Sequence, residues 1–229
     1  MRQVHVDPEY ETIAMFGTNC LNNNIESIIK ANDICDRYGL DTISAGATIA
    51  FTIECFENGL ITRADTDGIE MTWGNHRAIV AMTEKLAKRE GFGALLADGV
   101  KVAAEKIGKD ADKYAMHIQG QELPAHDPKH AFNYATGYRL DPTPGRHFVG
   151  SELSEAPAHP SGLLPRFDLK SFAGRGEAHK IGSNFHHAMV CAGMCLFVYW
   201  AFPSVEPVAE FMRAVTGWDT TTAELLKLL

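Results

Sequence analysis

Apolar residues recur at helical spacing along most of the chain, and this pattern predicts a mostly α-helical protein. The clearest case is 24–38, where Asn22–Asn24 can cap a helix, Gly39 can end it, and these apolar residues recur at helical spacing: Ile25, Ile28, Ile29, Ile34 and Cys35. The same pattern predicts further helices at 41–58, 75–90, 92–107, 177–200, 204–216 and 219–228. Residues 69–73, which alternate in polarity, and 114–119 are predicted to form short strands.

Glycine and proline become frequent between residue 120 and about 176. Because these residues interrupt regular structure, the stretch is predicted to form loops. A loop-rich region of this length inside a compact protein is usually functional. We therefore expect two helical domains or subdomains, one or two short β segments and a long loop-rich region near 120–176.

Composition and charge narrow the function classes. The chain carries 21 Lys and Arg against 29 Asp and Glu, a net charge of −8, and it has no basic run, so we do not expect it to bind nucleic acid. It shows neither a signal peptide nor an apolar stretch of about 18 residues, so we expect a cytoplasmic protein that does not span a membrane. An odd, scattered set of cysteines argues against a disulfide framework and for a reducing compartment: Cys20, Cys35, Cys55, Cys191 and Cys195.

Two residue pairs in the predicted helix 177–200 could carry metal chemistry. His186 and His187 are adjacent, so their side chains point about 100° apart and cannot easily chelate one ion. We interpret this pair as structural. Cys191 and Cys195 are four residues apart and are predicted to share a helical face. They could bind a metal or cluster together, although packing in the interior is the commoner use of cysteine.

Candidates for acid–base chemistry lie near the start of the chain and in the loop-rich region. Glu9 and Glu11 are two residues apart in a segment predicted to be extended, so both carboxylates would face one side. They could form a solvated edge or supply a general acid or base. Three histidines fall where site residues concentrate, and each could be a ligand or an acid–base group: His126, His130 and His147.

The segment 36–42 joins two predicted helices. Gly39 lets the backbone turn sharply and approach a ligand closely. Asp41 is the predicted N-cap of the second helix, whose free N–H groups favour an anion or a polar ligand. Spacing alone predicts a helix–turn–helix connection at this point and nothing more.

Long motifs in a fixed order resemble a known family. Pro8–Thr12, Asn19–Cys20 and Ala31–Ser44 resemble the aldehyde ferredoxin oxidoreductase family. The likeness continues through Arg89–Gly93, Leu96–Val100, Met116–Gly120, Glu122–Pro128 and Ala214–Asp219. That family carries a tungsten, sometimes molybdenum, bis-molybdopterin cofactor and a 4Fe–4S cluster. The resemblance therefore implies oxidation of an aldehyde to a carboxylate, with electrons passing through the cluster to ferredoxin.

The resemblance also implies roles for single residues. Glu11 matches the family's glutamate near the metal, and His147 matches its substrate-pocket histidine. A carboxylate and an imidazole beside a high-valent metal suit the proton movements of aldehyde oxidation. Cys195 matches the fourth cysteine ligand of the cluster. The family's first pterin-binding motif, Asp-x-x-Gly-Leu-Asp/Cys, matches Asp36, Gly39, Leu40 and Asp41.

Departures from the family pattern limit what is implied. Val190 stands where the second pterin motif has an aspartate. In the family, a β-rich domain and a Cys-x-x-Cys-x-x-x-Cys run precede the Glu11 segment, and we expect both to lie outside this chain. The resemblance assigns 1–115 to the second domain and 116–229 to a C-terminally shortened third domain. Because a 4Fe–4S cluster takes four ligands and Cys195 is one, we expect the chain alone to be inactive.

Several assemblies are compatible with the resemblance. The missing N-terminal domain could belong to the same polypeptide or to a separate subunit of a split enzyme. The intact enzyme would be a homodimer that uses an aldehyde and ferredoxin. A related alternative is a subunit of an acyl-CoA ring reductase. The loss of the aspartate at Val190 leaves a third alternative, a decayed or repurposed helical module that binds a partner without chemistry.

Overall fold

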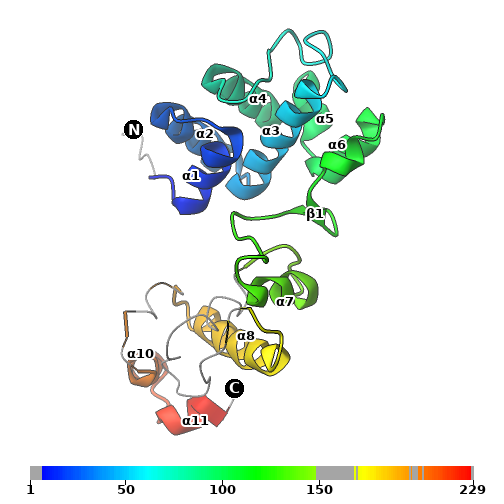
Figure 1. Ribbon diagram of the computed structural model, residues 1–229. Helices are drawn as coiled ribbons and strands as arrows, with labels where there is room; N and C mark the ends of the chain where they lie inside the picture. The colour runs from blue at the N-terminus through cyan, green and yellow to red at the C-terminus, as the bar shows by residue number, and fades with distance from the viewer. Residues whose placement is uncertain are drawn as a thin grey trace, which may run out of the picture. The chain divides into compact units, whose positions relative to one another are not determined.

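The computed structural model describes residues 7–147, 168, 170–195, 197, 201–202 and 204–227. Helices dominate this part of the chain, and its single sheet is one pair of short strands, so the predicted mostly α-helical fold class is confirmed (Figure 1). The described residues form two compact units, one ending at Ala125 and one starting at His126. The assignment of 1–115 and 116–229 to two family domains stays a prediction.

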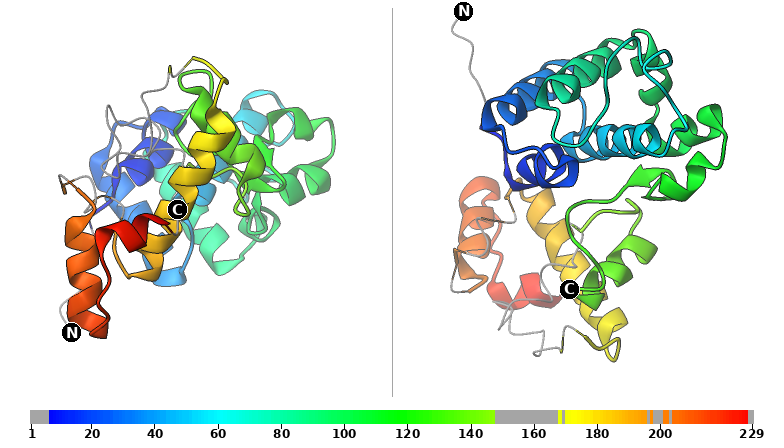
Figure 2. Two further views of the ribbon diagram at one scale, coloured as in Figure 1. Left: turned by 90° about the horizontal axis from the view of Figure 1, so that it is seen from below. Right: turned by 45° about the horizontal axis from the view of Figure 1, so that its top comes forward.

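The first unit is built around the apolar helix α3, Thr42–Glu57. Its isoleucines Ile49 and Ile53 are fully buried, and apolar residues lie on nearly all of its faces, which is typical of a helix at the centre of a core. Four α-helices pack against it: α1 (Tyr10–Phe16), α2 (Ile25–Tyr38), α4 (His76–Lys88) and α6 (Gly99–Ile107). Figure 2 shows the helices of this unit from two further directions.

Shorter elements complete the first unit: η1 (Thr18–Cys20), α5 (Phe92–Leu96), η2 (Ala111–Tyr114), β1 (His117–Ile118) and β2 (Gln121–Glu122). The two strands pair in antiparallel fashion. The buried carboxylate of Glu122 accepts the backbone N–H of Val100 at 2.7 Å, at the first turn of α6. This bond holds the hairpin against α6 and satisfies a helix N–H that has no partner within the helix.

Side-chain caps explain why α2, α3 and α4 begin close to where the sequence predicts. The caps are Asn24, Asp41 and Asn75, whose side-chain oxygens accept the backbone N–H three residues further on at 2.8, 2.8 and 3.3 Å. Each cap satisfies an N–H that the start of a helix leaves unpaired. The predicted helix 92–107 breaks into α5 and α6 at Gly99, whose φ of +87° is incompatible with a continuous helix.

The predicted strand at 69–73 is wrong, because these residues form an irregular segment that packs on the helical core. Met71 is fully buried, and the indole N–H of Trp73 donates to a carboxylate oxygen of Glu57 at 2.8 Å. The alternating sequence pattern thus arises because every second side chain packs on the core, although the segment does not pair with a strand. The strand predicted at 114–119 shortens to β1.

The prediction that Glu9 and Glu11 share one side of an extended segment is also wrong. Glu9 has extended backbone and is exposed, whereas Glu11 lies in the first turn of α1 and is buried. The helix begins between the two residues, so the alternation of an extended strand does not apply, and one carboxylate is exposed while the other is buried.

The second unit is smaller in its core and contains α7 (Phe132–Leu140), α8 (Arg175–Cys191), α10 (Glu206–Thr216) and α11 (Thr222–Lys227). Helix α7 lies inside the predicted loop-rich region, so part of that region is regular structure; residues 148–167 of it lie outside the described chain. Helix α8 ends at Cys191, earlier than predicted. One cluster of buried apolar residues in this unit comes from α8, α10, α11 and the residue before α10: Phe185, Met189, Val205, Val208 and Leu225.

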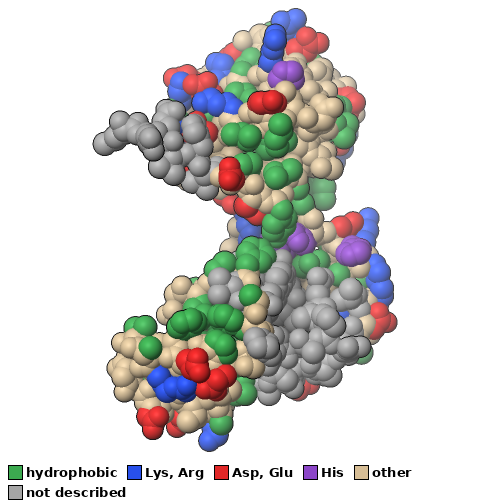
Figure 3. Space-filling view, turned by 90° about the vertical axis from the view of Figure 1, so that its left-hand side faces the viewer, with side chains coloured by type: hydrophobic (Ala, Val, Ile, Leu, Met, Phe, Trp, Pro, Cys, Tyr) green, Lys and Arg blue, Asp and Glu red, His purple; other side chains and the backbone are tan. Residues whose placement is uncertain are grey.

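Apolar side chains also lie on the surface of the second unit. Phe211, Val215 and Trp218 are 53%, 84% and 65% exposed. The space-filling view shows that hydrophobic side chains reach the surface of the described chain at several places (Figure 3). In the described part of the chain, no helix combines the length and apolar character that crossing a membrane requires.

Candidate functional site

Glu11 is a buried carboxylate held by a distant segment of the first unit. Its side chain is 2% exposed, and its Oε2 accepts the backbone N–H of Ala125 at 3.0 Å. The next residue, Thr12, donates from Oγ1 to the hydroxyl of Thr42 at 2.8 Å, which ties α1 to the start of α3. A carboxylate is expensive to bury unless hydrogen bonds compensate, and the Ala125 N–H supplies one such bond.

The predicted pterin motif lies at the α2–α3 connection, on the surface of the first unit. Gly39 ends α2 with φ +68° and ψ +39°, and the backbone N–H of Leu40 donates to the carbonyl of Cys35 at 2.9 Å. No atom lies within 4 Å of the place that a Cβ on Gly39 would occupy. The glycine is therefore needed for its backbone angle, which turns the chain from one helix into the next.

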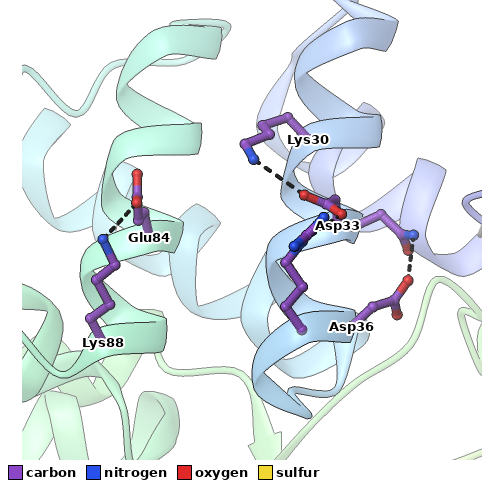
Figure 4. Close-up of polar contacts among 7 residues, drawn as sticks. Lys30, Asp33, Asp36, Glu84 and Lys88 are labelled. Carbon is purple, nitrogen blue, oxygen red and sulfur yellow. Dashed lines mark hydrogen bonds and ion pairs between the residues drawn. The ribbon is translucent and has the colours of Figure 1, made fainter. Parts of the chain in front are cut away.

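Both aspartates of the motif are exposed and already oriented. Asp36 accepts the side-chain amide of Asn32 at 3.0 Å, and Asp41 accepts the Ser44 N–H at 2.8 Å as the cap of α3. Figure 4 shows Asp36 on the same helix as Asp33, which instead pairs with Lys30. Both exposed carboxylates are hydrogen-bond acceptors, which is the chemistry that the N–H groups of a pterin ring require.

His147 belongs to a buried aromatic cluster of the second unit. It is 6% exposed, and its ring stacks on His126 with a centroid distance of 3.9 Å and an interplanar angle of 14°. The ring of Tyr134 meets His126 edge-on at 5.0 Å, and the hydroxyl of Tyr138 donates to the His126 carbonyl at 2.6 Å. Of the three loop-region histidines, the structure thus brings two together and leaves His130 exposed.

Sequence reasoning missed this cluster because it missed α7. Tyr134 and Tyr138 are four residues apart on that helix, which is the spacing that places both side chains on one face. A helical prediction for 132–140 would have pointed to them. The stacking of His126 on His147 joins residues 21 positions apart and has no signature in spacing.

Cys195 follows the end of α8 and is exposed. The prediction that it shares a helical face with Cys191 is wrong, because the helix ends at Cys191 and Gly193 takes a φ of +73°. The remaining three cysteines lie in the interior of the first unit, where burial is the main cause that raises the pKa of each thiol to about 12: Cys20, Cys35 and Cys55.

These positions decide how well the chain fits a 4Fe–4S cluster. Cluster ligands are thiolates, and such a cluster takes four of them. Cys20, Cys35 and Cys55 are buried among the apolar side chains of the first unit, whereas Cys191 and Cys195 are exposed. Cys195 fits as one ligand, and the cysteines of this chain do not suffice for the whole cluster.

The second motif keeps the turn of the first without its carboxylate. Met194 donates its N–H to the carbonyl of Met189 at 3.0 Å, five residues back, as Leu40 does in the first motif. Val190 is half exposed on the last turn of α8. The backbone needed by the motif is present, and an apolar side chain stands in the place of its acceptor.

Further buried polar groups of the second unit lie outside these motifs. A carboxylate oxygen of Asp141, at the end of α7, lies 2.6 Å from Nε2 of His179 on α8, and the two side chains are 4% and 11% exposed. His186 is buried, and desolvation is the main cause that lowers its pKa. This agrees with the structural interpretation of the His186–His187 pair. The Asp141–His179 contact fastens α7 to α8, and no sequence signal indicated it.

Comparison with known proteins gives these motifs a context. The family description "Aldehyde ferredoxin oxidoreductase, domains 2 & 3" matches residues 2–228. A tungsten-containing aldehyde ferredoxin oxidoreductase of Pyrococcus furiosus is 34% identical over 232 residues, which cover 96% of this chain and 36% of that protein. A WOR-like subunit of an aliphatic sulfonate oxidoreductase from the same organism is 29% identical and is covered to 32%.

A solved structure shares the fold. The active-site complex BamBC of benzoyl coenzyme A reductase, bound to 1,5-dienoyl-CoA, aligns with a TM-score of 0.69 and 20% sequence identity. The alignment covers 100% of this chain and 40% of that one. The chain spans about a third of the length of the relatives it matches. By the match over nearly all its residues, the chain belongs to the aldehyde ferredoxin oxidoreductase family, a family of oxidoreductases, and corresponds to its domains 2 and 3.

Proposed function

We propose that this chain forms the helical part of a tungsten-containing enzyme that oxidises an aldehyde to a carboxylate and passes the electrons to ferredoxin. The observation that carries the proposal is the buried Glu11 carboxylate, fixed by the Ala125 N–H in a family whose members are oxidoreductases. A bound tungsten bis-pterin would supply two-electron oxidation, in which an aldehyde and water become a carboxylic acid, two protons and two electrons.

Glu11 is proposed to receive a proton released in that reaction. Its Oε2 is held by the Ala125 N–H, so the plane of the carboxylate is set before substrate arrives. Burial keeps bulk water away from the group, so a proton released beside it would pass to this carboxylate rather than directly to solvent. Its position in the first turn of α1 places the negative charge at the favourable end of the helix dipole.

His147 is proposed to orient the aldehyde through a hydrogen bond to the substrate oxygen. Stacking on His126 restricts rotation of the His147 ring, and the edge of the Tyr134 ring closes another side. A ring held in this way loses less rotational freedom when it binds substrate. Asp36 and Asp41, separated by the Gly39–Leu40 turn, are proposed to accept hydrogen bonds from one pterin.

Cys195 is proposed to supply one thiolate of the 4Fe–4S cluster, and polypeptide beyond these 229 residues to supply the others. That polypeptide is either the remainder of a longer chain or a separate subunit, and the intact enzyme is proposed to be a homodimer. The isolated chain is then expected to have no oxidoreductase activity.

Substitution of Glu11→Gln in the assembled enzyme tests the proposal. The amide keeps the size of the side chain and removes the base, so aldehyde oxidation should fall by about 100-fold or more while tungsten content stays unchanged. Glu9→Gln is the matched control, because Glu9 is an exposed carboxylate two residues away, and its oxidation rate should stay near that of the unchanged enzyme. An unchanged rate in the Glu11→Gln enzyme would contradict the proposed function.

A further inference from the structure

A cavity of about 380 Å³ lies within the first unit, between α1, α3 and the segment that ends at Ala125. Small side chains leave this space open: Ala14 on α1, and Ala47 and Ala50 on α3. Its volume falls in the range of pockets that hold small molecules, about 300–1,000 Å³. The structure of the first unit thus contains room for a ligand of the size of a small aldehyde.

The cavity shares a wall with the Glu11 carboxylate. Ala125 lines the cavity, and its N–H is the group that donates to Oε2 of Glu11 at 3.0 Å. Ala14 and Met15, which also line it, follow Glu11 by three and four residues and therefore lie on the same face of α1. A molecule in the cavity would lie within about one helical turn of the carboxylate.

The residues that line the cavity favour a neutral, apolar ligand. Among the residues that line the cavity in the described chain, Glu54 is the one charged group, and neither lysine nor arginine is present. Burial, with a smaller contribution from neighbouring Glu57, raises the pKa of the Glu54 carboxyl. A phosphate or carboxylate ligand would find no cation here to offset its desolvation.

Three aromatic side chains form part of the cavity wall. Phe51, Trp73 and Tyr114 line the cavity together with the apolar side chains of Leu123 and Pro124. Aromatic rings favour offset or edge-to-face contacts with another ring, beyond the gain from burying its area. A planar ring is therefore a better match to this wall than a flexible polar chain.

We propose that this cavity binds the apolar side group of a neutral aldehyde, most favourably an aromatic ring, and so sets the substrate class of the enzyme. The inference rests on the proposed function, because it assigns the cavity to the substrate on which Glu11 acts. The same lining argues against coenzyme A thioesters as ligands of this cavity, because it offers no cation to their phosphates.

The test uses the whole chain and acetophenone, a neutral aryl ketone with nearly the shape of benzaldehyde that does not oxidise to an acid. Titration of a chain with carbon-13-labelled alanine methyl groups should give saturable NMR shifts at Ala14, Ala47 and Ala50. Coenzyme A, added in the same way, should leave these three methyl signals unmoved. Shifts confined to other alanines, or shifts of these three caused by coenzyme A, would overturn the inference.

Filling the cavity should abolish binding without unfolding the protein. Ala47→Leu and, on a different helix, Ala14→Leu should each weaken acetophenone binding by about tenfold or more, because the added side chain occupies the ligand volume. Ala87→Leu is the matched control, a half-buried alanine of α4 that does not line the cavity, and it should bind as the unchanged chain does. Thermal unfolding of each variant identifies any that does not fold. If one of the two cavity-filling variants does not fold, the inference is judged on the cavity-filling variant that does.

Unchanged acetophenone binding in a folded cavity-filling variant would overturn the assignment of the cavity. Failure of this inference is separable from failure of the proposed function, because the titration needs neither tungsten nor pterin. Absence of acetophenone binding overturns the cavity assignment alone. An unchanged oxidation rate in the Glu11→Gln enzyme overturns the proposed function.

Discussion

The ends of α2 and α8 carry the same turn with different side chains. At the end of α2, Gly39 has a φ of +68° and the N–H of Leu40 bonds a carbonyl five residues back; beyond α8, Gly193 has a φ of +73° and Met194 makes the equivalent bond. The residue three positions before the glycine is Asp36 in the first turn and Val190 in the second.

Comparison of the two turns shows which residue of the motif shapes the backbone and which one supplies the side-chain acceptor. The glycine fixes the path of the backbone, and no atom lies within 4 Å of a Cβ built on Gly39 or Gly193. The residue three positions earlier supplies the chemistry, and only Asp36 offers a carboxylate. We therefore expect the first turn to hold a pterin through side chains and the second to offer backbone groups and Cys195 alone.

Loss of the Cys195 thiol should have the largest effect. Cys195→Ser in the assembled enzyme should remove the cluster, because one of its four thiolates is gone, and electron transfer to ferredoxin should fall to background. Cys191→Ser is the matched control, since Cys191 is also exposed and lies four residues earlier. Iron analysis and the visible absorbance of the cluster provide the measurement; equal iron loss in both variants would contradict the assignment.

Removal of the Asp36 carboxylate should have the next largest effect. Asp36→Ala should weaken retention of the pterin cofactor by about 2 kcal/mol, or roughly 30-fold, because a charge-assisted hydrogen bond is lost. The control is Asp33→Ala on the same helix, where Asp33 pairs with Lys30 and Arg37 (Figure 4). The measurement is pterin content after prolonged dialysis, and equal loss from both variants would show that Asp36 makes no contact of its own.

The two glycines should respond alike. Gly39→Ala and Gly193→Ala should each lower the free energy of unfolding by about 1 kcal/mol, because both need the left-handed backbone region and neither Cβ would clash. Urea unfolding of the chain measures both. A much larger cost at one glycine would break the equivalence of the two turns.

An aspartate placed in the second turn should have the smallest effect on stability. Val190→Asp puts a negative charge in the last turn of α8, next to the negative end of the helix dipole, so unfolding should become easier by about 0.5 kcal/mol. Val215→Asp, an exposed valine in the last turn of α10, is the control and should cost a similar amount. In the assembled enzyme only Val190→Asp should increase pterin retention; no increase would mean that more than this side chain is missing.

The sequence predicted the elements whose signals are local. Helices α2, α3 and α4 begin at capping residues that are visible in the sequence, namely Asn24, Asp41 and Asn75. Where the same local pattern is compatible with two kinds of backbone structure, the prediction was wrong. Residues 69–73 bury alternate side chains without forming a strand, and Glu11 lies in a helix.

The candidate site depended on contacts between residues far apart in the chain. The bond from Ala125 to Glu11 spans 114 residues, and the His126–His147 stack lies against Tyr134 of α7. Spacing carries no information on such contacts. The roles proposed for Glu11 and His147 come from family resemblance, to which the structure adds their burial.

Metal analysis of the isolated chain tests the central claim, that it supplies only part of the cofactor machinery. The chain should be purified anaerobically, alone and after co-expression with a polypeptide of the family that carries the Cys-x-x-Cys-x-x-x-Cys run. Alone it should contain neither iron in cluster amounts nor stoichiometric tungsten, and the co-expressed assembly should contain both. Stoichiometric iron and tungsten in the isolated chain would contradict this account.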